Sequence, residues 1–215
     1  MCFSTSASFG AGVLLTVIGI ASGKKIEKPS QILYASMPFL FASQQFIEGF
    51  VWLSLTNSDY AHWQSVPVNL FLFFAQVLWP IWVPLSIFLI EENKTRKKIL
   101  AILLVIGILL SLYISYCMYT YSVDAYLSPY HVNYVPHFPN VNPLLGALYF
   151  LPIFLPSFVS SIKNMFWQGT LLVCSYIITK LLFNDAVISV WCFFAALVSI
   201  MVFFVMRNLK QSNKI

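Results

Sequence analysis

The chain has 215 residues, of which 60% are hydrophobic and 9% are charged, and its formal net charge is +5. A soluble domain has roughly 45–50% apolar and about 25% charged residues, so this composition excludes an ordinary soluble domain. The positive charge does not indicate a nucleic-acid partner, because the basic residues stand in short segments beside long apolar runs, where they report orientation in a membrane.

Seven apolar runs divide the chain, each close to the roughly 20 residues that a helix needs to cross a hydrocarbon core about 30 Å thick. The runs are continuously apolar and do not alternate, which favours helices over the strands of a membrane barrel. We therefore predict an all-α polytopic membrane protein, a single domain over residues 1–215 with seven transmembrane helices. In chain order the runs are 7–22, 32–55, 66–90, 99–119, 143–160, 165–183 and 187–206.

The basic residues are concentrated in every second connection between the predicted helices. Connections on one side of the predicted membrane contain eleven of the twelve lysines and arginines, whereas the opposite connections contain Asp59, Asp124 and Asp185. Because positive charge is enriched on the cytoplasmic side, this pattern predicts an outer N-terminus and a cytoplasmic C-terminus. The eleven residues are Lys24, Lys25, Lys28, Lys94, Arg96, Lys97, Lys98, Lys163, Arg207, Lys210 and Lys214.

The second run contains the residue that most strongly suggests a function. Glu48 lies seven residues inside the predicted outer end of that helix, or about 10 Å at the rise of an α-helix. A carboxyl group is costly at this depth, so it should face the protein interior and could bind a proton. Gln44 and Trp52 share its helical stripe, and Gln45 flanks it.

Later runs bring further polar and aromatic side chains to a similar depth. Gln76 lies about ten residues from the outer end of the third run, and Lys180 lies near the outer end of the sixth. Lys180 could pair with Glu48, pair locally with Asp185, or extend to the outer interface. The predicted ligand or proton site comprises Glu48, Gln44, Gln45, Gln76, Lys180, Trp52, Trp79 and Trp191.

The third and fifth runs share a pattern of two prolines four residues apart. Pro80 and Pro84 occur in the third run, and Pro152 and Pro156 in the fifth. Proline inside a helix leaves a carbonyl without its usual partner and kinks the axis, so we predict that both helices are kinked and that a neighbour or a cavity satisfies the carbonyls. The alternative is that proline is simply commoner in membrane helices.

The longest connection, residues 120–142, is predicted to lie outside. Its tyrosines and prolines predict an ordered cap, which could be an aromatic belt at the membrane surface or a lid over an outward-facing cavity. His131 and His137 match no metal motif, so we predict no metal site and no cofactor. Cys2 could become an N-terminal nucleophile or acyl acceptor, but no base for it is identifiable and no catalytic residue is assigned.

Several segments together resemble an uncharacterised bacterial multipass membrane-protein family. The resemblance covers nearly the whole chain and implies a bacterial inner membrane, but it implies no activity. It rests on Met1-Cys2-Phe3-Ser4, Ala7-Ser8-Phe9, the Gln-Gln-x-x-Glu-Gly-x-x-Trp pattern from Gln44 to Trp52, and Trp191-Cys192-Phe193-Phe194-Ala195-Ala196.

These features support three interpretations. The first is a transporter or small-ligand sensor with an outer-half polar pocket centred on Glu48, whose partners are the lipid bilayer and a small solute or proton. The second is a structural or assembly protein whose polar residues only hold helices together. The third and least favoured is an intramembrane enzyme. The sequence does not determine the oligomeric state.

Overall fold

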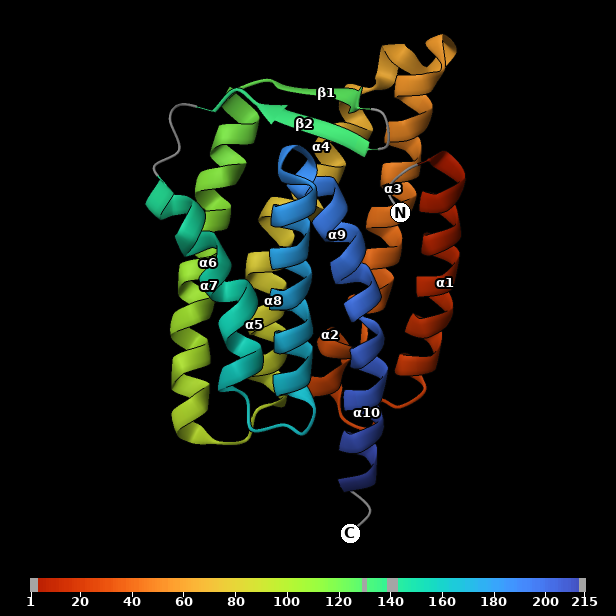
Figure 1. Cartoon of the computed structure of the whole chain (residues 1–215). Coiled ribbons are helices and arrows are strands. Elements are labelled where there is room, and N and C mark those ends of the chain that lie inside the picture. Colours follow the sequence, from red (N-terminus) through yellow and green to blue (C-terminus); the bar gives the residue numbers. More distant parts are fainter. Residues whose placement is uncertain (1–3, 129–130, 139–142, 213–215) are drawn as a thin grey trace.

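Helices of the chain run side by side in one bundle, and a short β-hairpin crosses one end of it (Figure 1). The computed structural model describes residues 4–128, 131–138 and 143–212. In chain order the elements are α1 (Thr5–Gly23), η1 (Pro29–Gln31), α2 (Ile32–Ala35), α3 (Met37–Thr56), η2 (Ser58–Trp63), α4 (Ser65–Leu72), η3 (Phe73–Leu78), α5 (Trp79–Ile90), α6 (Lys94–Thr120), β1 (Val123–Ser128), β2 (His131–Pro136), α7 (Pro143–Val159), α8 (Met165–Leu182), η4 (Asn184–Ala186), α9 (Val187–Val198) and α10 (Ile200–Ser212).

The predicted helical fold is confirmed. Within the described residues, five helices are long and apolar enough to cross a membrane, if contiguous elements are joined as one helix. The α3 helix has 20 residues but includes the polar stripe around Glu48, and the apolar part of α7 is short, Gly146–Val159. The five are α1, the helix from α4 to α5, α6, α8 and the helix from α9 to α10.

The helices expose many apolar side chains and bury a stripe of polar ones, which is unusual for a soluble protein. Val17 of α1 is 58% exposed and Leu112 of α6 is 63% exposed, whereas Gln44, Gln45 and Glu48 of α3 are fully buried. An apolar surface around a partly polar interior is the arrangement expected where lipid is the surrounding solvent. It fits the five helices that could span a membrane.

The helix from α4 to α5 changes its winding in the middle. Phe73–Leu78 form a π-helical segment that is followed by Trp79 and Pro80. A wider turn leaves carbonyls without helical partners, and neighbours supply them: the Tyr149 hydroxyl of α7 donates to the Ala75 carbonyl, and the Ser111 hydroxyl of α6 donates to the Val77 carbonyl at 2.7 Å. Neighbouring helices thus satisfy part of this irregular backbone, while the kinks that the proline pattern predicts for the third and fifth runs stay a prediction.

The connection after α6 contains a hairpin that the sequence analysis did not predict. Strand β1 pairs with β2 in antiparallel register, with Ala125 opposite Tyr134. Both side chains are buried, and the Tyr134 ring stacks on Phe71 of α4 at a centroid distance of 4.8 Å. His137 Nε2 lies 2.8 Å from Asp124 Oδ2 beside the strands. The hairpin lies across the ends of the helices in Figure 1, and its inner face packs on them.

Candidate functional site

The polar stripe of α3 is hydrogen-bonded within the bundle. Glu48 is fully buried, and its Oε1 accepts a hydrogen bond of 2.5 Å from the Ser189 hydroxyl of α9. Its Oε2 accepts a longer bond of 3.4 Å from Gln45 Nε2, one turn earlier on α3. The carboxyl group therefore joins α3 to α9 in a part of the molecule closed to solvent.

Gln44 connects the same stripe to α5. The Trp79 indole Nε1 donates to Gln44 Oε1 at 2.9 Å, and the Trp79 ring stacks on Phe41 with centroids 3.9 Å apart. The side chain of Trp79 is thus fixed on two sides, by one hydrogen bond and one stacked ring, both provided by α3. This anchoring matters because Trp79 forms part of the wall of a cavity.

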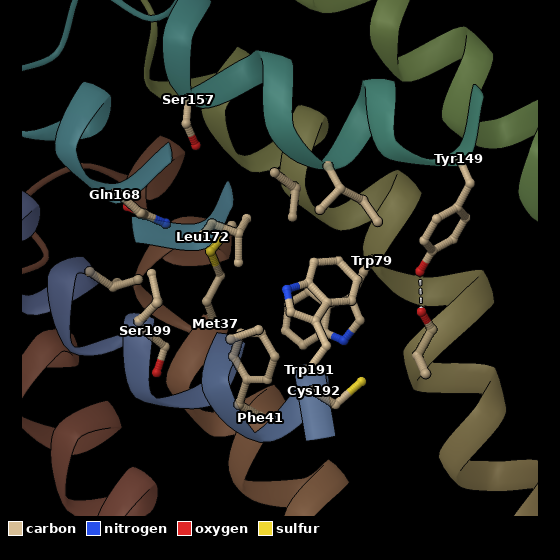
Figure 2. A pocket seen from close by; sticks show the side chains of 16 residues that line it. Met37, Phe41, Trp79, Tyr149, Ser157, Gln168, Leu172, Trp191, Cys192 and Ser199 are labelled. Atoms are coloured by element: carbon tan, nitrogen blue, oxygen red, sulfur yellow. Dashed lines mark hydrogen bonds between the residues drawn. The ribbon is translucent and has the colours of Figure 1, made fainter. Parts of the chain in front are cut away.

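That cavity lies between α3, α5, α7, α8 and α9 and has a volume of about 50 Å³. Figure 2 shows Phe41, Trp79 and Trp191 beside one another in its wall, with Tyr149 at one side and a dashed line marking its hydrogen bond. Most lining side chains are aromatic or aliphatic; its hydroxyl and amide groups belong to Tyr149, Ser157, Gln168 and Ser199.

A second and larger cavity of about 260 Å³ lies between α6, α7, α8 and α9. Gln76 of the π-helical segment lines it, and Pro136 and Phe138 bring the end of the hairpin region to its wall. The two cavities share part of their walls. The shared residues are Ala75, Tyr149, Trp191 and Cys192.

The predicted site therefore divides into two groups. Gln76, Trp79 and Trp191 line a cavity, as the hypothesis of a pocket requires. The other residues line neither of these two cavities, so these cavities are not centred on Glu48. The polar stripe of α3 instead faces the side chains of α5 and α9, where Trp79 bonds Gln44 and Ser189 bonds Glu48. The residues outside the walls are Glu48, Gln44, Gln45, Trp52 and Lys180.

Two of these residues lie apart from the Glu48 cluster, and for Lys180 this is one of the alternatives that the sequence left open. Lys180 is exposed on α8, and no ion pair joins it to Glu48 within the described part of the chain. Its long side chain can remain at the surface because it lies in the last turn of α8. Trp52 is buried in the apolar cluster that also contains Phe71 and Cys192. The side chain of Asp185, the alternative partner of Lys180, is outside what the structure describes.

Sequence reasoning missed several residues that form the site. Ser189 and Cys192 lie one turn apart on α9, one bonded to Glu48 and the other in the wall of both cavities. Their position in the sequence could have indicated them, since both residues lie within three positions of Trp191 in the seventh run. Another missed pair joins α2 to α8, where the buried Tyr34 hydroxyl donates to Gln168 Oε1.

A family model matches the chain over residues 1–215, its full length. The chain belongs to DUF6629, a family of unknown function. This confirms the resemblance to an uncharacterised family. No curated protein and no solved structure matches the chain. Within the residues that the structure describes, this DUF6629 member has no cluster of three or more His, Cys, Asp or Glu side chains suited to a metal. Cys2 lies outside those residues.

A second buried carboxyl group of this DUF6629 member lies at the opposite end of the bundle from the hairpin. Glu91 follows α5 and is 1% exposed. Its oxygens accept hydrogen bonds from the Ser161 hydroxyl at 2.6 Å, the Ser161 amide at 2.7 Å and the Ser160 hydroxyl at 3.0 Å. Burial raises the pKa of Glu91, but the hydrogen bonds from Ser161, Asn93 and Ser160 outweigh it, and the net result is a lowered pKa.

The Glu91 cluster ties the connection after α5 to the connection after α7. A further bond nearby joins the first turn of α6 to the end of α7, because Arg96 Nη1 donates to the Val159 carbonyl at 3.0 Å. The sequence analysis assigned Arg96 a role in orientation alone. The cluster closes the end of the bundle away from the hairpin and holds α5, α6 and α7 in place around the cavities.

Proposed function

We propose that the protein crosses a bacterial inner membrane seven times, with its N-terminus outside and its C-terminus in the cytoplasm. Five helices have the required length and composition, and α3 and α7 would supply the other two crossings. Burial of the polar stripe of α3 supports this, because a helix that hides Gln44, Gln45 and Glu48 from lipid can cross despite them. In Figure 1, α1 begins toward the hairpin end and α10 ends at the opposite end, which fits an odd number of crossings.

We further propose that the protein binds a small, mostly apolar molecule in the two adjoining cavities and acts as a sensor of that molecule. The observation that carries this proposal is the shared wall of Ala75, Tyr149, Trp191 and Cys192. Adjoining cavities with mostly apolar walls and a few polar groups are typical of ligand sites. A cavity of about 150 Å³ holds benzene, so the larger cavity, at about 260 Å³, is large enough for one or two rings.

The wall chemistry favours this function over transport of a polar solute. A polar solute would need polar groups to replace its hydration. The carboxyl group of Glu48 could provide this, but it is not part of either wall. A proton-coupled role of Glu48 stays a prediction, and the absence of Glu48 from both cavity walls does not favour it. The bond from Ser189 to Glu48 supports a second candidate function, in which the polar residues hold α3 against α9 and the protein is structural.

The test uses naphthalene as an apolar probe and protein labelled with 5-fluorotryptophan in lipid nanodiscs. Fluorine signals would be assigned by replacing each tryptophan with phenylalanine. We expect the signals of Trp79 and Trp191 to shift saturably with naphthalene, because both rings line the cavities. Trp167 is 61% exposed on α8 and serves as the control for general partition into lipid. Equal shifts at all three positions, or none at Trp79 and Trp191, would reject the proposal.

Two matched glycine variants locate the probe. Gly146 lines the larger cavity, and a Cβ atom added there meets no atom within 4 Å. The exposed Gly10 of α1 is equally open but lies in no cavity wall. We expect Gly146→Leu to weaken naphthalene binding at least fivefold, since it fills cavity space, and Gly10→Leu to leave it unchanged. Unchanged binding in both variants would place the probe elsewhere.

A further inference from the structure

One polar group in the cavity walls has no partner. Trp191 of α9 is 8% exposed and lines both cavities. Its indole Nε1 has no hydrogen-bond acceptor among the described residues. The other indole of the wall differs, because Trp79 Nε1 donates to Gln44. A buried donor without an acceptor costs roughly 1–3 kcal/mol, so such a group calls for an explanation.

Aromatic side chains surround the Trp191 ring and fix its orientation. Phe150, Phe154 and Tyr176 meet it edge to face, with centroids 5.9, 5.7 and 5.4 Å from its own. Three aromatic contacts from α7 and α8 leave the indole little rotational freedom. Its N–H is therefore a fixed donor in an aromatic wall.

The walls also limit the charge of a ligand. The residues that line the two cavities include no Asp, Glu, Lys, Arg or His, and those walls are drawn from the described residues. An ion placed there would lose its hydration without gaining a counter-charge. The occupant that fits is uncharged, and the unpaired indole N–H adds the requirement of one acceptor oxygen.

We propose that the bound molecule is a small uncharged ring compound with a carbonyl oxygen, and that this oxygen accepts a hydrogen bond from Trp191 Nε1. The proposal rests on the proposed ligand-binding function and specifies its ligand class. The apolar body of the molecule occupies the larger cavity. Its carbonyl group lies at the shared wall, where the Trp191 ring borders both cavities; neighbouring atoms cover Nε1 there, so the oxygen reaches it by displacing them.

The test compares two probes of nearly the same shape, 2-acetylnaphthalene and 2-isopropenylnaphthalene, which differ in a carbonyl oxygen against a methylene group. Dissociation constants would be measured from the fluorine signal of labelled Trp79 in wild type, Trp191→Phe and Trp52→Phe. Trp52 is the matched control because it is also buried with an unpartnered indole N–H but lines neither cavity. The two probes partition differently into lipid, but each probe partitions equally whichever variant is present. The ratio of dissociation constants can therefore be compared between variants without a correction.

We expect the ratio of the two dissociation constants to favour the ketone and to fall by about 3- to 10-fold in Trp191→Phe, the range of a single buried hydrogen bond. The Trp52→Phe variant should keep the wild-type ratio. Retained binding of 2-isopropenylnaphthalene shows that Trp191→Phe is folded. If both probes bind with the same ratio in wild type and Trp191→Phe, the hydrogen bond to Trp191 is refuted and the ligand site stands. If neither probe binds wild type, the proposed function itself fails.

Discussion

The close approach of α6 to α5 at Gly107 gives the sharpest prediction. Gly107 of α6 faces the carbonyl of Pro80, which Pro84 cannot bond one turn later because proline has no N–H. A Cβ atom added at Gly107 would lie 1.9 Å from that oxygen and 2.8 Å from its carbon. Carbon and oxygen approach to about 3.3 Å in close contacts, so Gly107→Ala must separate α5 and α6 by about 1.4 Å. The Pro80 oxygen belongs to the backbone, so it cannot rotate away from the added methyl group.

Overpacking of this kind costs roughly 1–3 kcal/mol, so we expect Gly107→Ala to lower the free energy of unfolding by about 2 kcal/mol. Denaturation by SDS in mixed micelles, followed by circular dichroism, would measure it. Gly10→Ala adds the same methyl group where no atom lies within 4 Å and should leave stability unchanged or slightly higher. Equal stabilities of the two variants would refute the close approach of α5 and α6.

Three further predictions concern side chains that hold the bundle together by hydrogen bonds. Because the pKa of Glu91 is lowered, its carboxylate stabilises the fold above the ordinary glutamate pKa near 4.5, and this contribution is lost as the pH falls through the lower native pKa. Glu91→Gln should lower the free energy of unfolding at pH 7 by about 1.5–3 kcal/mol, and its unfolding temperature should fall less steeply as the pH is lowered. If the unfolding temperature falls with pH as steeply as in wild type, Glu91 is not the titrating group. Ser189→Ala removes the donor to Glu48 and should cost about 1–3 kcal/mol in denaturation, whereas Ser189→Thr keeps the hydroxyl and most of the stability. Tyr149→Phe leaves a carbonyl of the π-helical segment without its donor, and we expect faster amide hydrogen exchange there; wild-type protection would contradict the assignment.

Much of the fold was predictable because lipid allows few alternatives. A continuously apolar run must satisfy its own backbone, so each of the seven predicted runs contains helix in the structure. The inward direction of Gln44, Gln45 and Glu48 was predictable for the same reason, since polar groups on a lipid-facing side would be costly. The breaks within runs were not, such as the one at Ser199 between α9 and α10.

The site was less predictable because it depends on how helices rotate about their axes. The stripe of α3 specified that Glu48 faces inward but not that Ser189 would bond it or that the cavities would form beside Trp191 instead. The predicted depth of Lys180 in the membrane is close to that of Glu48, yet the Lys180 side chain is exposed on α8. The hairpin was missed because its tyrosines and prolines resemble an irregular loop. Its inward positions, among them Ala125 and Val132, were the signal that could have revealed it.

The π-helical segment has a further consequence for the evolution of this chain. A residue inserted into an α-helix rotates everything beyond it by about 100°, because 3.6 residues complete one turn. The wide turn at Phe73–Leu78 absorbs such an insertion locally, so α4 can face the hairpin and α3 while α5 faces α6 and α7. Deleting one residue there would restore regular winding but misalign the two halves. Relatives of this protein should therefore conserve the length of this segment more strictly than its sequence.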